Sequence, residues 1–105
     1  MERYAWQGKI RDGCLDEYIE RHKALWPAMI VELKNAGIVN YSIWTNGTDL
    51  FGYYECEKGV QFAVDFQYNS PTVQQWEAYM RDILIMEKNE QTKAQPKLTE
   101  VFRLD

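Results

Sequence analysis

The sequence predicts one α+β domain in which a four-stranded antiparallel sheet carries helices on one face. Four segments have the residue pattern of strands, helical spacing fills the gaps after the first and third strands, and turn signals separate these elements. The resulting order is strand, helix, strand, strand, helix or helices, strand, which is the split βαβ or ferredoxin-like arrangement. At 105 residues the chain has the length of a single domain, 1–105.

The first and last predicted strands lie at the two ends of the chain. Residues 3–10 place Tyr4 and Trp6 on one side with small or polar residues on the other, and the turn signal Asp12-Gly13 follows. Residues 98–104 have the pattern of a final strand, after a polar stretch over 87–97 that predicts an exposed loop.

The two middle strands form a predicted hairpin. Residues 38–45 are rich in β-branched and aromatic side chains, and residues 50–57 form the return strand. Asn46-Gly47 between them is a strong hairpin signal.

The first helical region, residues 14–36, contains Pro27. Proline lacks an N–H and suits the first position of a helix, so we expect one helix to end near 23–25 and a second to run from Pro27 to Asn35. Gly37 is placed to cap its end.

The second helical region follows the hairpin. Residues 60–68 predict a short helix, and residues 72–84 predict another, with Ser70 or Thr72 as its N-cap.

Composition excludes several classes of function. The formal charge is −4 with no basic run, which argues against a nucleic-acid binder. No apolar run has the length of a membrane span and none resembles a signal peptide, so a cytoplasmic location is expected. Cys14 and Cys56 have no metal-type spacing, and a disulfide between them is not expected in that compartment.

One face of the predicted sheet has no helix to cover it, which favours a homodimer joined through that face.

The candidate site is a helical stripe that contains the only histidine in the sequence. Tyr18, His22 and Trp26 are spaced by four residues, so they lie on one helical face. An imidazole can donate and accept protons near neutral pH. The alternative is an ordinary helix: His22 as a hydrogen-bonded boundary residue, Tyr18 as another, and Trp76 of the later helix as part of the core.

The sequence carries no motif for covalent, nucleotide-dependent or metal-dependent chemistry. It has no G-x-S-x-G, P-loop or Rossmann fingerprint, and one histidine is too few for a histidine-rich metal site. Acid–base chemistry without a cofactor remains, with His22 as acid or base and Tyr18 and Tyr41 as hydrogen-bonding groups.

A set of motifs along the whole chain resembles the L-rhamnose mutarotase family. The matching residues stand in the same order and at nearly the same separations: Tyr18, Arg21-His22, Trp26-Pro27, Gly37, Asn40-Tyr41, Trp76, Tyr79-Met80, Asp82 and Glu100-Val101-Phe102. The resemblance implies a dimeric α+β barrel that interconverts the α and β anomers of a 6-deoxy sugar. It places the proton-donor histidine on His22 and the substrate-contacting residues on Tyr18, Tyr41 and Trp76.

The sequence departs from the family at the second residue of a tryptophan pair, where it has Glu77. A carboxylate accepts hydrogen bonds from hydroxyls, whereas an indole covers the apolar face of a pyranose. Glu77 is therefore a candidate substrate-binding residue that bears on which sugar is bound, and the alternative is a solvated helix residue. Ala28 and Arg103 are lesser departures.

The mechanism we expect is general acid–base catalysis of mutarotation, with L-rhamnose or a related sugar such as L-fucose as substrate. His22 would protonate the ring oxygen on opening and take the proton back on closure, Tyr18 would hold or relay a hydroxyl, Tyr41 would orient the sugar, and Trp76 would form a wall. Two alternatives stay open: a haem- or quinone-type monooxygenase of the same fold class, and a sugar-binding protein without catalysis.

Overall fold

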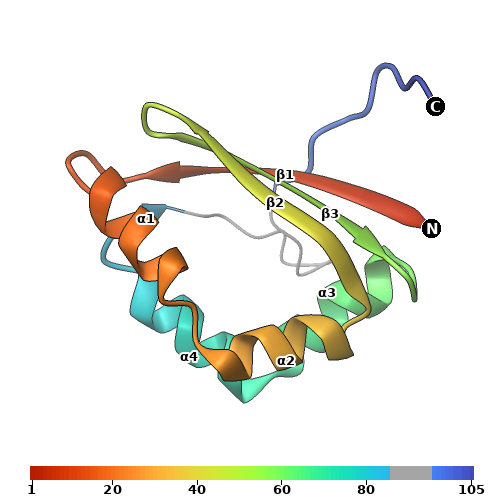
Figure 1. The fold of residues 1–105 in the computed structure, drawn as a ribbon, viewed down its shortest axis with the longest axis horizontal. Coiled ribbons are helices and arrows are strands. Elements are labelled where there is room, and N and C mark those ends of the chain that lie inside the picture. The colour runs from red at the N-terminus through yellow and green to blue at the C-terminus, as the bar shows by residue number, and fades with distance from the viewer. Residues whose placement is uncertain (86–95) are drawn as a thin grey trace.

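A computed structural model, which describes residues 1–85 and 96–105, contains one antiparallel sheet with the strand order β2-β3-β1-β4. Its helices lie together on one face of that sheet (Figure 1). The strands are β1 (Glu2–Ile10), β2 (Ile38–Asn46), β3 (Asp49–Cys56) and β4 (Leu84–Ile85), and the helices are α1 (Leu15–Lys23), α2 (Pro27–Asn35), α3 (Val60–Asn69) and α4 (Pro71–Met80). The predicted α+β, ferredoxin-like architecture is confirmed.

The core lies between the sheet and the helices. β1 and β3 pair along most of their length and alternate strictly, so one face of each strand is buried and the other is not. Tyr4, Trp6 and Ile10 of β1 and Leu50 and Tyr54 of β3 are almost completely buried on the helix-covered face. This alternation is the one predicted from the sequence.

The break between α1 and α2 occurs where the sequence predicted it. Trp26 adopts an extended conformation, as the residue before a proline usually does, and Pro27 opens α2. The backbone of Gly37 after α2 is left-handed, with φ +78°, which suits the predicted glycine cap. Because the chain turns at this break, α1 and α2 cover different parts of the sheet (Figure 1).

The predicted helix over residues 72–84 is too long at its C-terminal end. α4 ends at Met80, and Leu84 and Ile85 form the edge strand β4, paired with Ile10 and Lys9 of β1. The free edge of β1 offers backbone hydrogen bonds to this segment, and Arg11 N–H also donates to the carbonyl of Ile83. Pairing with the sheet edge therefore outweighs the helical spacing of the apolar residues in this segment.

The prediction of a strand over residues 98–104 is wrong. Pairing with β1 is limited to a short stretch, in which Gln7 N–H donates to Pro96 O and Leu98 N–H donates to Ala5 O. In the described residues beyond Leu98 the backbone no longer pairs with β1, and the contact continues through the side chains of Arg3 and Glu100, which form an ion pair. The remaining residues extend away from the sheet on the side opposite the helices (Figure 1). Of the predicted loop over 87–97, residues 87–95 lie outside the described residues.

The helix-free face of the sheet exposes apolar side chains. Trp44 of β2 is 68% exposed and lies opposite Phe51 of β3 in the strand register. In the C-terminal segment Val101, Phe102 and Leu104 are exposed as well. Within the described residues, no helix is both long and apolar enough to cross a membrane.

Candidate active site

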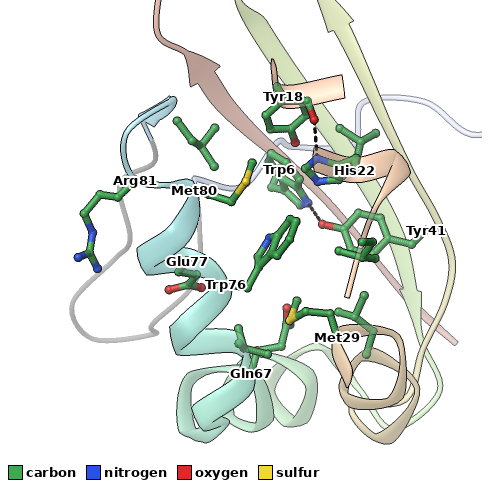
Figure 2. A pocket seen from close by; sticks show the side chains of 15 residues that line it. Trp6, Tyr18, His22, Met29, Tyr41, Gln67, Trp76, Glu77, Met80 and Arg81 are labelled. Carbon is green, nitrogen blue, oxygen red and sulfur yellow. Dashed lines mark hydrogen bonds between the residues drawn. The ribbon is translucent and has the colours of Figure 1, made fainter. Parts of the chain in front are cut away.

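A cavity of about 680 Å³ lies between the sheet and the helices, a volume typical of small-molecule sites. Much of its wall is apolar, with Leu25, Met29, Leu33 and Met80 among the lining residues. A few polar side chains interrupt this wall (Figure 2).

Of the residues predicted for the site, all except Trp26 of the helical stripe line this one cavity. They come from three elements of the fold: Tyr18 and His22 of α1, Tyr41 of β2, and Trp76 and Glu77 of α4. The structure therefore brings together residues that are up to 59 positions apart in the sequence.

The imidazole of His22 is held between two aromatic rings. The Tyr18 ring, one turn earlier on α1, stacks on it with 4.3 Å between the ring centroids. The Trp76 indole meets it edge-on, with 5.6 Å between centroids and an interplanar angle of 88°. Contacts with both α1 and α4 therefore restrict the orientation of the imidazole.

The next residue toward the N-terminus, Arg21, fastens α1 to the end of α4. Its guanidinium forms an ion pair with Asp82 at 2.9 Å and donates to the carbonyl of Tyr79 at 2.8 Å. The same group pairs with Glu17 and lies over the Tyr79 ring. The hydrogen bond from Arg21 lowers the pKa of the Asp82 carboxyl. The two helices that hold His22 and Trp76 are thereby tied together outside the cavity.

The hydrogen bond of His22 determines which nitrogen carries a proton. Nδ1 lies 3.1 Å from the backbone carbonyl oxygen of Tyr18, which can only accept, so Nδ1 is the protonated nitrogen. Burial lowers the pKa of His22 below its usual value of 6.5, although the carbonyl acts in the opposite direction. At neutral pH the imidazole is therefore uncharged, and the lone pair of Nε2 is available to accept a proton.

Tyr41 faces the cavity because β2 contains a bulge. The pairing register of β2 with β3 shifts between Val39 and Ser42, and Asn40 has a left-handed backbone with φ 51°. The extra residue reverses the alternation, so Tyr41 lies on the helix-covered face. Asparagine tolerates this conformation better than most residues, and the Asn40 amide also donates to the Glu55 carboxylate.

The two phenols of the site are hydrogen-bond donors and not bases. Burial is the main cause that raises the pKa of Tyr18 and of Tyr41 well above the usual value of 10. Both hydroxyls therefore keep their protons throughout the physiological range. The Tyr41 oxygen accepts a hydrogen bond from the indole nitrogen of Trp6 at 3.1 Å.

Trp76 belongs both to the core and to the cavity wall. Its side chain is 8% exposed and packs edge-on against Trp26, with 5.1 Å between ring centroids. Trp76 is therefore a core residue that also lines the cavity, and its contact with a substrate stays a prediction. Trp26, the third residue of the predicted stripe, supports Trp76 from behind and does not itself line the cavity.

Glu77 follows Trp76 on α4, is half-buried and lines the cavity, so it is not a fully solvated helix residue. Arg81, four residues later and just past the end of α4, also contributes to the lining. In Figure 2 the Arg81 side chain extends away from the imidazole. The α4 side of the cavity thus has polar groups separate from those around His22.

Sequence reasoning missed three polar contributors to the cavity: Trp6, Gln67 and Arg81. Trp6 was predicted only as a strand residue, and Gln67 of α3 was not singled out. Gln67 follows the buried Ala63 by four residues, so a polar side chain on the inward face of a helix was the available signal. Across the described residues, no cluster of three or more His, Cys, Asp or Glu side chains could hold a metal ion.

Comparisons with known proteins agree on one family. A family model described as L-rhamnose mutarotase matches residues 3–104. Proteins named L-rhamnose mutarotase from Jannaschia sp. (strain CCS1) and Phocaeicola vulgatus are 33% and 34% identical, over 99% and 100% of both chains respectively. The crystal structure of an L-rhamnose mutarotase from Formosa agariphila superposes with a TM-score of 0.80 and 28% identity over the full length of both chains.

Proposed function

The chain belongs to the L-rhamnose mutarotase family, and we propose on that premise that it interconverts the α and β anomers of L-rhamnose or a closely related 6-deoxy sugar. The reaction is an isomerisation of a carbohydrate. One observation of the structure carries the proposal: an uncharged imidazole faces a largely apolar cavity of small-molecule size, with two protonated phenols in the same lining.

Mutarotation needs proton transfers and no strong oxidant or reductant. The anomeric hydroxyl loses its proton, the bond from C1 to the ring oxygen opens, C1 rotates, and the ring closes on the other face. A positioned acid or base typically accelerates such a step by about 10²–10⁴-fold. The lining residues supply this chemistry without a cofactor.

His22 is the catalytic residue in this proposal. The sequence led us to expect that it protonates the ring oxygen on opening, and that role stays a prediction. The contact of Nδ1 with the Tyr18 carbonyl supports a particular order of steps. Nε2 first takes the proton of the anomeric hydroxyl and then delivers it to the ring oxygen.

The remaining candidates bind the sugar. Tyr18 and Tyr41 donate hydrogen bonds to its oxygens, and the Trp76 ring covers an apolar part of the pyranose. Glu77 accepts a hydrogen bond from a hydroxyl on the α4 side of the cavity, where it would discriminate between sugars. Family membership does not favour the alternative of a haem- or quinone-type monooxygenase.

We also propose that the protein forms a homodimer through the helix-free face of the sheet. That face exposes Trp44, and exposed apolar patches of this kind mark interaction sites. Light scattering should give the mass of a dimer, and Trp44→Glu should reduce it to that of a monomer. A monomeric native protein at micromolar concentration would refute this part of the proposal.

A cytoplasmic location is likewise proposed, and cell fractionation tests it.

Saturation-transfer NMR over a panel of L-rhamnose, L-fucose and other aldoses tests the function. We expect anomeric exchange to be fastest for a 6-deoxy sugar and to return nearly to the uncatalysed rate in His22→Ala, with the fold retained. Lys23→Ala is the matched control, because Lys23 is the next residue on α1 and is exposed. Wild-type protein that binds the sugars without accelerating exchange would favour a non-catalytic sugar-binding protein.

A further inference from the structure

We propose that Trp6 is a positioning residue for the reaction, since its indole N–H holds the Tyr41 hydroxyl as a hydrogen-bond donor to a sugar oxygen in the cavity. This inference rests on the proposed function. It concerns a strand residue in the cavity lining that would act on the sugar through Tyr41 (Figure 2).

The hydrogen bond between the two side chains fixes the direction of donation. An indole nitrogen can only donate, so the Tyr41 oxygen is the acceptor across the 3.1 Å separation. Trp6 is 2% exposed, and a buried N–H without an acceptor would be costly. With one side of its oxygen occupied by the indole, Tyr41 retains a proton to donate. Within the described residues, this hydroxyl has no protein acceptor for that proton.

The fold leaves space for the Trp6 indole against strand β3. Trp6 lies opposite Gly52 in the pairing of β1 with β3. A Cβ atom at position 52 would lie 2.1 Å from Cε2 of Trp6 and 2.3 Å from its Nε1, far inside van der Waals contact. The absence of a side chain at Gly52 therefore allows the indole to lie against the sheet and reach Tyr41.

The Tyr41 hydroxyl can stabilise the negative charge that develops on a sugar oxygen during the reaction. On ring opening, the proton on the anomeric oxygen moves to Nε2 of His22, a double bond forms between C1 and that oxygen, and the C1–ring-oxygen bond breaks. The electron pair of that bond goes to the ring oxygen, which then receives the proton from Nε2. Negative charge develops on oxygen during these steps. Tyr41 keeps its own proton and stabilises that charge by a hydrogen bond, and polarisation by the indole strengthens this bond.

A double-mutant cycle tests the role, with kcat and KM measured from anomeric exchange at several sugar concentrations. Trp6→Phe removes the N–H and keeps an aromatic ring, and we expect kcat to fall roughly fivefold to tenfold with little change in KM. Tyr41→Phe should lower kcat on the order of 10²-fold. Because Trp6 acts through Tyr41, adding Trp6→Phe to Tyr41→Phe should lower kcat by less than about twofold more.

Tyr4→Phe is the matched control, since Tyr4 lies on the same face of β1, is equally buried, and does not line the cavity. It should leave kcat and KM unchanged. If wild-type protein gives no exchange, the proposed function fails. If wild-type protein is active but Trp6→Phe has no effect, or its effect multiplies fully with that of Tyr41→Phe, the positioning role is overturned.

A spectroscopic measurement keeps the inference testable should Trp6→Phe fold poorly. In the Tyr41→Phe protein, the indole N–H resonance of Trp6 should move upfield because it has lost its acceptor, while those of Trp26 and Trp44 stay in place. An unchanged Trp6 resonance would show that the indole does not bond to Tyr41 in solution.

Discussion

A single methyl group at position 52 should damage both stability and catalysis. In Gly52→Ala the new Cβ would stand 2.1 Å from the Trp6 ring, whereas ordinary contacts begin at 3.4 Å. Backbone pairing of Gly52 with both neighbouring strands leaves β3 little freedom to shift. The indole of Trp6 must therefore retreat by more than 1 Å, which stretches its 3.1 Å hydrogen bond with Tyr41 beyond bonding range.

The expected magnitude follows from overpacking of a tight core. Such insertions typically lower the free energy of unfolding by about 1–3 kcal/mol. For a chain of this size that corresponds to a fall in Tm of roughly 4–15 °C. The catalytic loss should match that of Trp6→Phe, since both changes remove the same hydrogen bond.

Urea denaturation and anomeric exchange, measured on the same samples, test this prediction. In a Trp6→Leu background the clashing indole atoms are absent, so Gly52→Ala should cost much less stability there than in the native protein. This comparison separates the indole clash from any general intolerance of strand β3 to alanine. A native-like denaturation midpoint and exchange rate in Gly52→Ala would refute the claim that the Trp6 indole occupies the space left by Gly52.

Three further predictions concern the pH profile, the strand bulge and the α4 side of the cavity. Catalysis that begins with uncharged His22 should be retained at neutral pH and should decline as pH falls through a pKa that lies below the usual 6.5. The free energy of unfolding should also fall as pH drops from 6.5 through the lowered pKa of folded His22, because in that range the unfolded chain binds a proton that the folded chain does not. A loss of activity or of stability that is already complete at pH 6.5 would contradict this expectation. Asn40→Val should place a β-branched residue at φ 51° and lower both stability and exchange by disturbing Tyr41, whereas Asn40→Gly should preserve both; equal rates in the two variants would show that the bulge does not control Tyr41. Glu77→Trp should shift the preference towards L-rhamnose over sugars with a hydroxyl at C6, and an unchanged ranking by NMR would mean that position 77 does not touch the sugar.

The parts of the fold that were predictable are those with a local cause. Alternation predicted which side of β1 is buried, and Pro27 divided the first helical region at the correct residue. The errors lie in segments whose secondary structure depends on pairing with a distant strand edge. Leu84 was predicted as the last residue of a helix, yet it pairs with the free edge of β1 and forms β4 together with Ile85. Residues 98–104 alternate like a strand, yet their backbone pairing with β1 ends at Leu98.

The same distinction explains what the sequence revealed of the site. The spacing of Tyr18 and His22 within one helix made their proximity predictable, and the family resemblance added Tyr41, Trp76 and Glu77. The protonation of His22 was not predictable, because it depends on burial under Trp76 and on a backbone carbonyl.

Trp6 shows why a residue of plain strand character can escape sequence reasoning. Its inward direction follows from alternation, but its partner depends on two features of other strands. The bulge at Asn40 turns Tyr41 to the same face, and Gly52 leaves the space through which the indole reaches it. Each feature has an unremarkable explanation when taken alone, since asparagine and glycine are common at irregular strand positions. Only the pairing register of β1, β2 and β3 connects them, so the hydrogen bond between Trp6 and Tyr41 is a product of tertiary structure.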